Sequence, residues 1–205
     1  MSLDFEEAPA GLDGVVLGHS TVAAHAHAGS GSLEAHLDQG PSFFDALSKL
    51  LGPSLIPFLL ADTVHAQWFV QWDAALEVDA AKLRPLLENR LADSPGALTP
   101  AQTIELWKLV AVIENAAGSF PSIAPGIWHC FEASYTFPAD LVPGSLDLKL
   151  DGATLLSFDD LSILEHLPAV EAVLDQIFGG KVVVTSATRA WLDDLLVSTE
   201  PTSCN

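Results

Sequence analysis

The part of the chain that follows residue 40 opens with apolar positions at the spacing of amphipathic helices. Apolar side chains recur on one face of residues 43–51, and a Gly-Pro pair ends this segment. Residues 80–92 show the same period, with Asp79 placed to cap a helix and Pro85 near the helix start. We therefore expect the N-terminal half of the chain to be mainly helical.

The clearest helix signal covers residues 102–117. Thr99 stands at the N-cap position, Pro100 at the first helical position, and Gln102 three residues after the cap, which is the arrangement of a capping box. Polar side chains occupy only a narrow stripe of this segment, so most of its surface is apolar. We expect a buried helix at the centre of the core.

The C-terminal half changes to the two-residue period of β-strands. Apolar and aromatic side chains alternate along residues 127–137, which places them on one side of a strand. Two further strand-like runs, residues 145–150 and 153–158, flank Asp151-Gly152, a pair suited to the positive φ angles of a type I′ hairpin turn. These residues predict an antiparallel sheet.

The remaining segments are less distinctive. Residues 63–72 are compatible with a strand or a buried helix, and their two tryptophans have the spacing of one helical face. Residues 181–186 form a short apolar run typical of a strand. Residues 168–178 and 187–197 have the pattern of helices.

Together these elements indicate an α+β fold, with a helical N-terminal half packed on a small, mainly antiparallel sheet formed by the C-terminal half. Residues 1–40 differ in composition, because they are rich in Gly, Ala, Ser and His and contain no Lys or Arg. We therefore divide the chain into an N-terminal segment, residues 1–40, and a single α+β domain, residues 41–205. A chain of 205 residues can bury a core without help from a disulfide or a metal.

Acidic side chains dominate the polar positions. The chain has 27 Asp and Glu against 8 Lys and Arg, a formal net charge of −19, although 49% of its residues are hydrophobic. The few cations are scattered and cannot neutralise a row of phosphates, so we expect neither nucleic acid nor a membrane surface as a partner. The charge favours basic proteins as partners, and it also keeps a hydrophobic chain in solution.

The two cysteines are expected to be free. Cys130 lies in an apolar stretch, as a small buried side chain would, and Cys204 is the penultimate residue. A disulfide framework would need more pairs, so the cysteines indicate a reducing cytosol. The first residues lack the pattern of a signal peptide, and the longest apolar run, residues 50–61, is too short to span a membrane. We expect a cytoplasmic protein.

Histidines near the N-terminus are the candidate metal ligands. His19, His25 and His27 all occupy odd positions, so one extended strand would bring the three imidazoles to the same face, with Glu34 and His36 close behind. Neutral imidazoles bind zinc or another divalent metal. The pattern predicts a metal site formed by His25 and His27, with His19 and His36 as further ligands. The alternative is a histidine-rich surface segment without a ligand, since no H-E-x-x-H helix accompanies it.

Other reactive side chains form no known catalytic motif. There is no G-x-S-x-G nucleophile elbow, and we assign no catalytic residue. Asp159-Asp160 are placed to cap a following helix, and Asp193-Asp194 to lie on the solvated face of the last one. Three histidines stand alone in the sequence and are expected to be structural: His65, His129 and His166.

Three functions are open at this stage. The charge favours a non-catalytic protein-interaction module of the inhibitor, immunity or adaptor type, which docks a basic partner. The histidines offer a metal-dependent hydrolase or a metal-binding protein instead. The hydrophobic fraction offers a structural component of an oligomeric assembly, including a homo-oligomer. The composition is similar to that of immunity proteins and nucleic-acid mimics, but no alignable motif supports a family.

Overall fold

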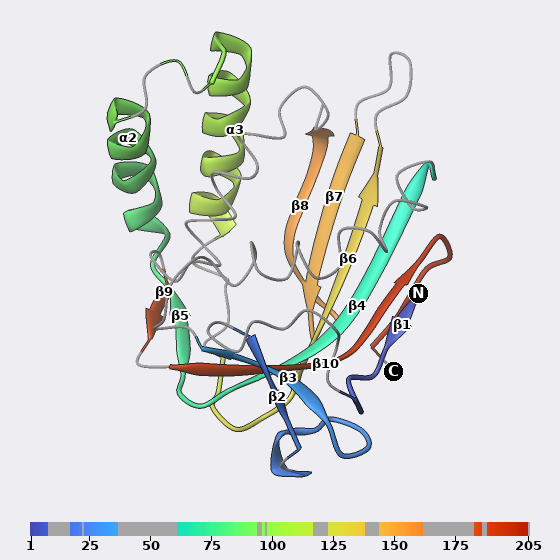
Figure 1. Ribbon diagram of the computed structural model, residues 1–205. Coiled ribbons are helices and arrows are strands. Elements are labelled where there is room, and N and C mark those ends of the chain that lie inside the picture. Colours follow the sequence, from blue (N-terminus) through green and yellow to red (C-terminus); the bar gives the residue numbers. More distant parts are fainter. Residues whose placement is uncertain are drawn as a thin grey trace.

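The computed structural model describes residues 1–7, 17–21, 23–36, 61–93, 96, 98–116, 123–137, 144–161, 183–185 and 188–204. Within them the chain forms an eight-stranded sheet in which every strand pair is antiparallel (Figure 1). The order of the strands is β2-β3-β10-β4-β6-β7-β8, and β1 pairs with the far end of β10. These strands are β1 (Ser2–Leu3), β2 (Leu17–Ser20), β3 (Ser32–His36), β4 (Thr63–Trp72), β6 (His129–Thr136), β7 (Gly144–Leu150), β8 (Ala153–Leu161) and β10 (Arg189–Ser198).

A helical N-terminal half is not found, and this part of the expected fold is wrong. Strands β1 to β4 come from that half and join the same sheet as the C-terminal strands. In the described part of the chain only α2 (Leu83–Asp93) and α3 (Pro100–Ala116) are α-helices. A second, two-stranded sheet pairs β5 (Leu76–Val78) with β9 (Val183–Thr185). The molecule is therefore dominated by antiparallel sheet.

The local predictions for the two helices and the hairpin are confirmed. The helix expected over residues 80–92 begins as the short 3-10 helix η3 (Ala80–Lys82) and continues as α2. The Thr99 amide donates to Gln102 Oε1 at 2.8 Å and the Gln102 amide to Thr99 Oγ1 at 3.3 Å, which is the expected capping box. Between β7 and β8, Asp151 and Gly152 have φ angles of 49° and 78°, as a type I′ turn requires.

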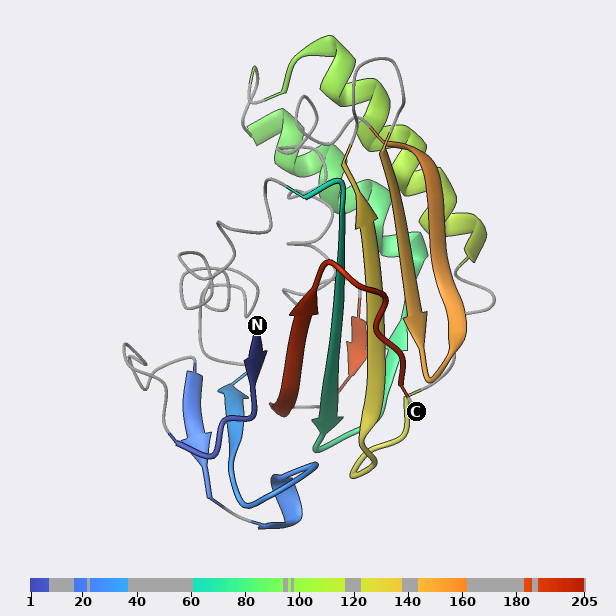
Figure 2. The same cartoon turned by 90° about the vertical axis from the view of Figure 1, so that its right-hand side faces the viewer.

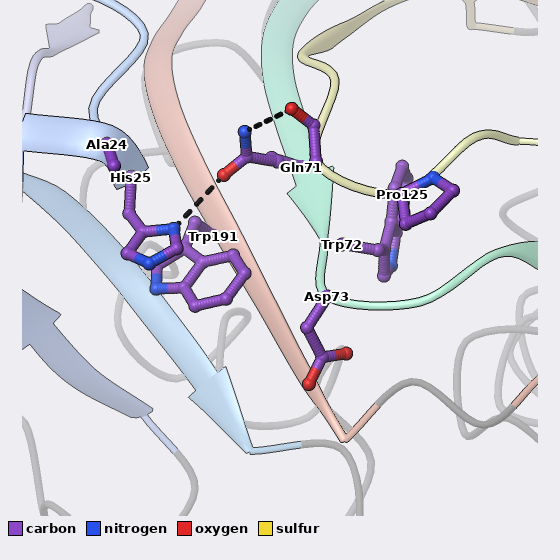
Figure 3. A pocket seen from close by; sticks show the side chains of 8 residues that line it. Ala24, His25, Gln71, Trp72, Asp73, Pro125 and Trp191 are labelled. Atoms are coloured by element: carbon purple, nitrogen blue, oxygen red, sulfur yellow. Dashed lines mark hydrogen bonds between the residues drawn. The ribbon is translucent and has the colours of Figure 1, made fainter.

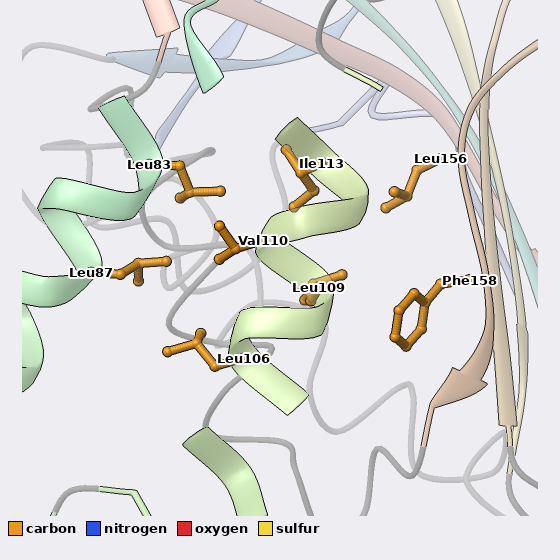
Figure 4. Packing of buried hydrophobic residues seen from close by; sticks show 8 residues of the cluster. All are labelled: Leu83, Leu87, Leu106, Leu109, Val110, Ile113, Leu156 and Phe158. Atoms are coloured by element: carbon orange, nitrogen blue, oxygen red, sulfur yellow. The ribbon is translucent and has the colours of Figure 1, made fainter. Parts of the chain in front are cut away.

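The helix α3 lies at the centre of the first buried cluster, as expected, but it is not buried all round. It packs between α2 and the outer strand β8, as Figure 4 shows, while Ile104 is 59% exposed. A helix that packs on one face needs only an apolar stripe, and the apolar residues beyond that stripe stay at the surface. The buried residues of this first cluster are Leu83, Leu87, Leu106, Leu109, Val110, Ile113, Leu156 and Phe158.

A second buried cluster lies on β3, β10 and β4. Successive residues of a strand point to opposite faces, so register-paired residues such as Ala190 and Trp72, or Leu192 and Val70, share a face. On this face Leu33, Val70 and Leu192 are buried, and Trp72 packs against them while partly exposed. The opposite face of the same strands carries Gln71 and Trp191, two side chains of the candidate site, while Trp72 reaches the site from the edge of this cluster.

The last helix expected from the sequence, residues 187–197, is the strand β10. It pairs with β3 and β4 on its two sides, and Figure 2 shows its dark red arrow beside β4. Its register with β4 shifts at a bulge between Asp193 and Leu196. Asp193 is fully buried, so the expected solvated pair Asp193-Asp194 is also wrong. The ambiguous segment, residues 63–72, is the strand β4.

A disulfide joins Cys130 of β6 to Cys204, with the two Cα atoms 6.0 Å apart, so the expectation of two free cysteines is wrong. The two residues are 74 positions apart in the chain, which is why their spacing indicates no pairing. The predicted helices at 43–51 and 168–178 lie outside the described residues, as does the predicted domain boundary at residue 40. No helix in the part described is both long and apolar enough to cross a membrane.

Candidate functional site

An open hollow of about 460 Å³ lies where β4 and β10 meet the turn before β6 (Figure 3). Ligand sites commonly have volumes of roughly 300–1,000 Å³. The hollow collects residues from η1 (Ala23–His25), from the end of β4, from the turn and from β10. The lining residues are Ala24, His25, Gln71, Trp72, Asp73, Pro125, Gly126 and Trp191.

His25 forms one wall of the hollow and is held by two contacts. Its ring stacks on Trp191, with centroids 3.7 Å apart and planes inclined by 10°. Its Nδ1 lies 3.2 Å from Gln71 Oε1, and Gln71 Nε2 donates to the Gly126 carbonyl at 2.9 Å. Because Gln71 Nε2 donates to the Gly126 carbonyl, Gln71 Oε1 faces His25 and accepts a hydrogen bond from its Nδ1–H. A neutral His25 then keeps Nε2 as a hydrogen-bond acceptor.

Asp73 stands at the exposed rim, directly after β4. Its carboxylate accepts hydrogen bonds from the Thr188 amide at 3.0 Å, the Thr188 hydroxyl at 2.9 Å and the Arg189 amide at 3.2 Å. These bonds fix the carboxylate without neutralising it. The Arg189 guanidinium pairs with Glu34, at 3.6 Å, and among the described residues Asp73 has no ion pair.

A second histidine lies near the hollow, over β4 and β10. The His27 ring stacks on Phe69, with centroids 3.6 Å apart, and its Nδ1 lies 2.7 Å from Asp194 Oδ2. The carboxylate of Asp193 accepts from the backbone amides of His27 at 2.9 Å, Ala28 at 3.4 Å and Asp194 at 2.9 Å. Desolvation raises the pKa of Asp193 above its usual range, although the three amide bonds oppose this. Asp193 thus fixes the loop of His27 onto the sheet.

The predicted metal ligands are not on one strand. His19 lies in β2, His25 in η1 and His27 in the bend that follows, while His36 ends β3. The imidazole of His36 lies 3.3 Å from Glu34, so three of the four histidines have different partners. The described residues contain no group of three or more His, Cys, Asp or Glu side chains that could hold a metal ion. The metal site therefore stays a prediction without a built centre.

The isolated histidines pair with side chains from other strands. His65 Nδ1 lies 2.8 Å from the Ser134 hydroxyl, and the two residues are register partners on β4 and β6. His129 Nδ1 lies 2.7 Å from the carboxylate of Asp151 in the hairpin turn. Both pairs agree with a structural role, while His166 lies outside the described residues.

The structure also places one residue of the acidic pair Asp159-Asp160 and the two tryptophans of β4. Asp159 lies inside β8, which continues to Leu161, so it is not at a helix N-terminus. Trp68 packs parallel to Phe131, with ring centroids 5.5 Å apart, and belongs to the partly buried rim of the second cluster. Trp72 has a different position, because it also lines the hollow.

Most of the residues that line the hollow could not be predicted from the sequence. Asp73, Pro125 and Trp191 come from distant segments that meet only after β4, β6 and β10 pair. The only local signal is a tryptophan followed by an aspartate at the end of a strand-like run. No protein-family model matches the chain, and no curated protein matches its sequence.

Proposed function

We propose that this protein is a non-catalytic interaction module that docks a basic partner protein. The observation that carries the proposal is that positive side chains of this protein pair with its own carboxylates, which leaves a large excess of negative charge. In the described part of the chain, five Lys and Arg side chains pair with carboxylates of the same chain. The pairs are Lys82–Asp79, Arg84–Glu114, Lys108–Glu105, Lys149–Glu132 and Arg189–Glu34.

The remaining carboxylates form a large uncompensated surplus. Since 27 acidic side chains face 8 basic ones, 19 carboxylates are left after every cation is counted. A surplus of one sign steers oppositely charged proteins toward the surface and repels nucleic acid and anionic lipid. Because the five described cations named above pair with carboxylates, they do not form a positive patch that would attract partners of the opposite charge.

The hollow supports binding over covalent chemistry. The described residues of its lining supply ring faces, hydrogen-bond acceptors and small side chains, and none of them is a Ser, Thr, Cys or Lys nucleophile. Rings and fixed acceptors are what a recognition surface needs, because they bury area at low entropic cost.

Affinity capture from host extract tests the proposal. The immobilised protein is expected to retain proteins of high isoelectric point at about 50 mM salt and to release them at about 500 mM, because screening shortens the range of the attraction. A triple variant, Asp62→Asn, Asp93→Asn and Glu200→Gln, removes three exposed carboxylates and is expected to retain less. The proposal is contradicted if the immobilised wild type and the immobilised triple variant retain the same proteins, or if the wild type retains none.

The compartment is a separate proposal. The cytoplasmic expectation rested partly on free cysteines, and the bond between Cys130 and Cys204 removes that premise. Disulfides persist mainly in oxidising compartments, so we place the protein there. Protein isolated from its host under trapping of free thiols is expected to have none; two trapped thiols favour the cytoplasm instead.

The two alternative functions stay predictions with direct tests. Stoichiometric metal in protein purified without chelator would support the metal-binding alternative that uses His25 and His27. A mass larger than one chain in solution would support the oligomeric alternative.

A further inference from the structure

We propose that the hollow beside Trp72 binds an arginine side chain of the basic partner. This inference rests on the proposed function and names the site and the group through which the partner is recognised. Three observations support it. The hollow is lined by a tryptophan and an aspartate, Trp72 and Asp73, and it offers a further hydrogen-bond acceptor on His25. Elsewhere in the same protein, a tryptophan and a carboxylate already hold the guanidinium of Arg84.

The internal example is the site that this chain builds for its own Arg84. The Arg84 guanidinium lies 5.1 Å from the ring centroid of Trp107 and donates to both carboxylate oxygens of Glu114, at 3.1 and 2.8 Å. The Glu114 hydrogen bonds raise the pKa of Arg84, so the charged form is favoured there. A tryptophan face and a carboxylate therefore already hold a guanidinium in this protein.

The hollow contains the same two residue types, a tryptophan and a carboxylate, and none of the described residues that line it is a Lys or Arg. Trp72 and Asp73 are adjacent in the chain, at the end of β4, and both line the hollow. The Asp73 carboxylate is held by Thr188 and Arg189 amides and has no ion pair among the described residues. It lies at the rim of an aromatic wall, where a cation is attracted both by the ring and by the carboxylate.

His25 adds one further acceptor to the lining. The bond from its Nδ1 to Gln71 leaves Nε2 as an acceptor in the neutral imidazole, and none of the described residues that line the hollow is a Lys or Arg. A phosphate or carboxylate ligand would meet Asp73 without a compensating donor. A ligand that only donates, and carries positive charge, matches what the hollow offers.

Arginine fits this lining better than lysine. The guanidinium is planar and stacks on aromatic faces, while its fork of N–H groups reaches two acceptors at once. The ammonium of lysine is a strongly hydrated point charge and gains less from a ring. The walls here are flat, since the His25 ring lies parallel to Trp191 within 10°.

Titration with blocked tripeptides tests the inference on the full chain. The probes are acetyl-Gly-Arg-Gly-amide, its Lys analogue and its uncharged Gln analogue, and the readout is the indole N–H resonances, with Trp72 assigned from Trp72→Phe. The arginine probe is expected to shift the Trp72 signal saturably and more tightly than the lysine probe. The Gln probe is expected to give no saturable shift.

Two variants and one control locate the effect. Asp73→Asn keeps an oxygen for the Thr188 amide and is expected to weaken the arginine probe by about tenfold, the value of one charge-assisted bond. His25→Phe keeps a ring on Trp191, removes the Nε2 acceptor and is expected to weaken it as well. Asp93→Asn removes the same charge from the exposed end of α2 and is expected to change little.

The outcomes separate this inference from the proposed function. No saturable shift, equal binding of the Gln probe, or equal loss in Asp73→Asn and Asp93→Asn would overturn the arginine site. If the wild type and Asp73→Asn capture the same basic proteins with the same salt dependence, the interaction function holds and the hollow is not its site. If no basic protein is captured although the arginine probe binds, the proposed function fails and the hollow remains a guanidinium site.

Discussion

Asp193 illustrates how one buried residue controls the local path of the chain. Its carboxylate has no exposed surface and accepts hydrogen bonds from the amides of His27, Ala28 and Asp194. The next residue, Asp194, has a φ of 48°, and the register of β10 shifts between Asp193 and Leu196. A bulge that turns a carboxylate inward toward free amides satisfies donors that no strand partner could reach.

The raised pKa of Asp193 predicts a specific pH dependence of stability. The folded state keeps the proton to a higher pH than the unfolded state, so the unfolding free energy contributed by this group falls as pH rises through the folded pKa. Asp193→Asn has no proton to lose, so in denaturant titrations we expect its unfolding free energy to fall less steeply than that of the wild type as pH rises above about 4, the ordinary pKa of Asp. Asp62→Asn, at an exposed position, serves as the control and should keep the wild-type slope. Parallel slopes in the wild type and Asp193→Asn would contradict the assignment.

The Tyr135 hydroxyl is buried and has no hydrogen-bond partner among the described residues. An unsatisfied buried polar group costs about 1–3 kcal/mol, so Tyr135→Phe, which keeps the ring and removes only the hydroxyl, is expected to raise the unfolding free energy by up to about 1 kcal/mol. Chemical denaturation measures the change. A loss of stability would show that the hydroxyl has a partner, such as a water molecule.

The same residue allows a check in the unmodified protein. Tyr135 is the single tyrosine of the chain, so tyrosinate absorbance reports it alone. Desolvation raises its pKa to about 12, and we expect no tyrosinate signal near the ordinary value of about 10 while circular dichroism shows the folded state. A titration near 10 in the folded protein would mean that the hydroxyl is exposed.

At the scale of elements, the start of α3 gives the sharpest prediction. Thr99 and Gln102 exchange hydrogen bonds across the helix N-terminus, and α3 supplies half of the first buried cluster. Thr99→Ala removes the acceptor for the Gln102 amide and is expected to cost about 1 kcal/mol of unfolding free energy. Gln102→Ala leaves the Thr99 acceptor in place and should cost less. Equal stability of Thr99→Ala and the wild type would mean that water replaces the cap fully.

Elements with local signals could be predicted, and those defined by distant partners could not. The capping box of α3 and the Asp151-Gly152 turn depend on residues within a few positions, so the sequence shows them directly. The strand β10 is different, because Leu192 is buried on one face while Trp191 on the other is covered by His25. A strand buried on both faces loses the two-residue alternation, and its period no longer separates it from a buried helix.

The candidate site follows the same rule. His25 and His27 stand out in the sequence as a pair, and the metal hypothesis uses that spacing. In the structure each ring stacks on a different aromatic residue, Trp191 for His25 and Phe69 for His27. These partners come from β10 and β4, so the environment of the histidines depends on the strand register and not on their spacing.

At the scale of the whole molecule, the disulfide ties the C-terminal residues to the sheet. Cys204 bonds to Cys130 of β6, and its amide also donates to Glu132 Oε1 at 2.6 Å. The bond closes a loop between residues 74 positions apart, which spans β7 to β10. In the chain-entropy view, a loop of this length removes enough freedom from the unfolded chain to be worth about 4 kcal/mol.

Opening this bond should therefore be one of the most costly single changes in the protein. Cys204→Ser is expected to lower the unfolding free energy by about 2–4 kcal/mol, because measured disulfides often deliver less than the entropic value. Since stable domains commonly have about 5–15 kcal/mol, the variant should still fold at room temperature. Reduction of the wild type must produce the same loss, while reductant must leave Cys204→Ser unchanged; this comparison separates the covalent link from the effect of the serine. Two thiols that react in the denatured protein before any reductant is added would contradict the bond itself.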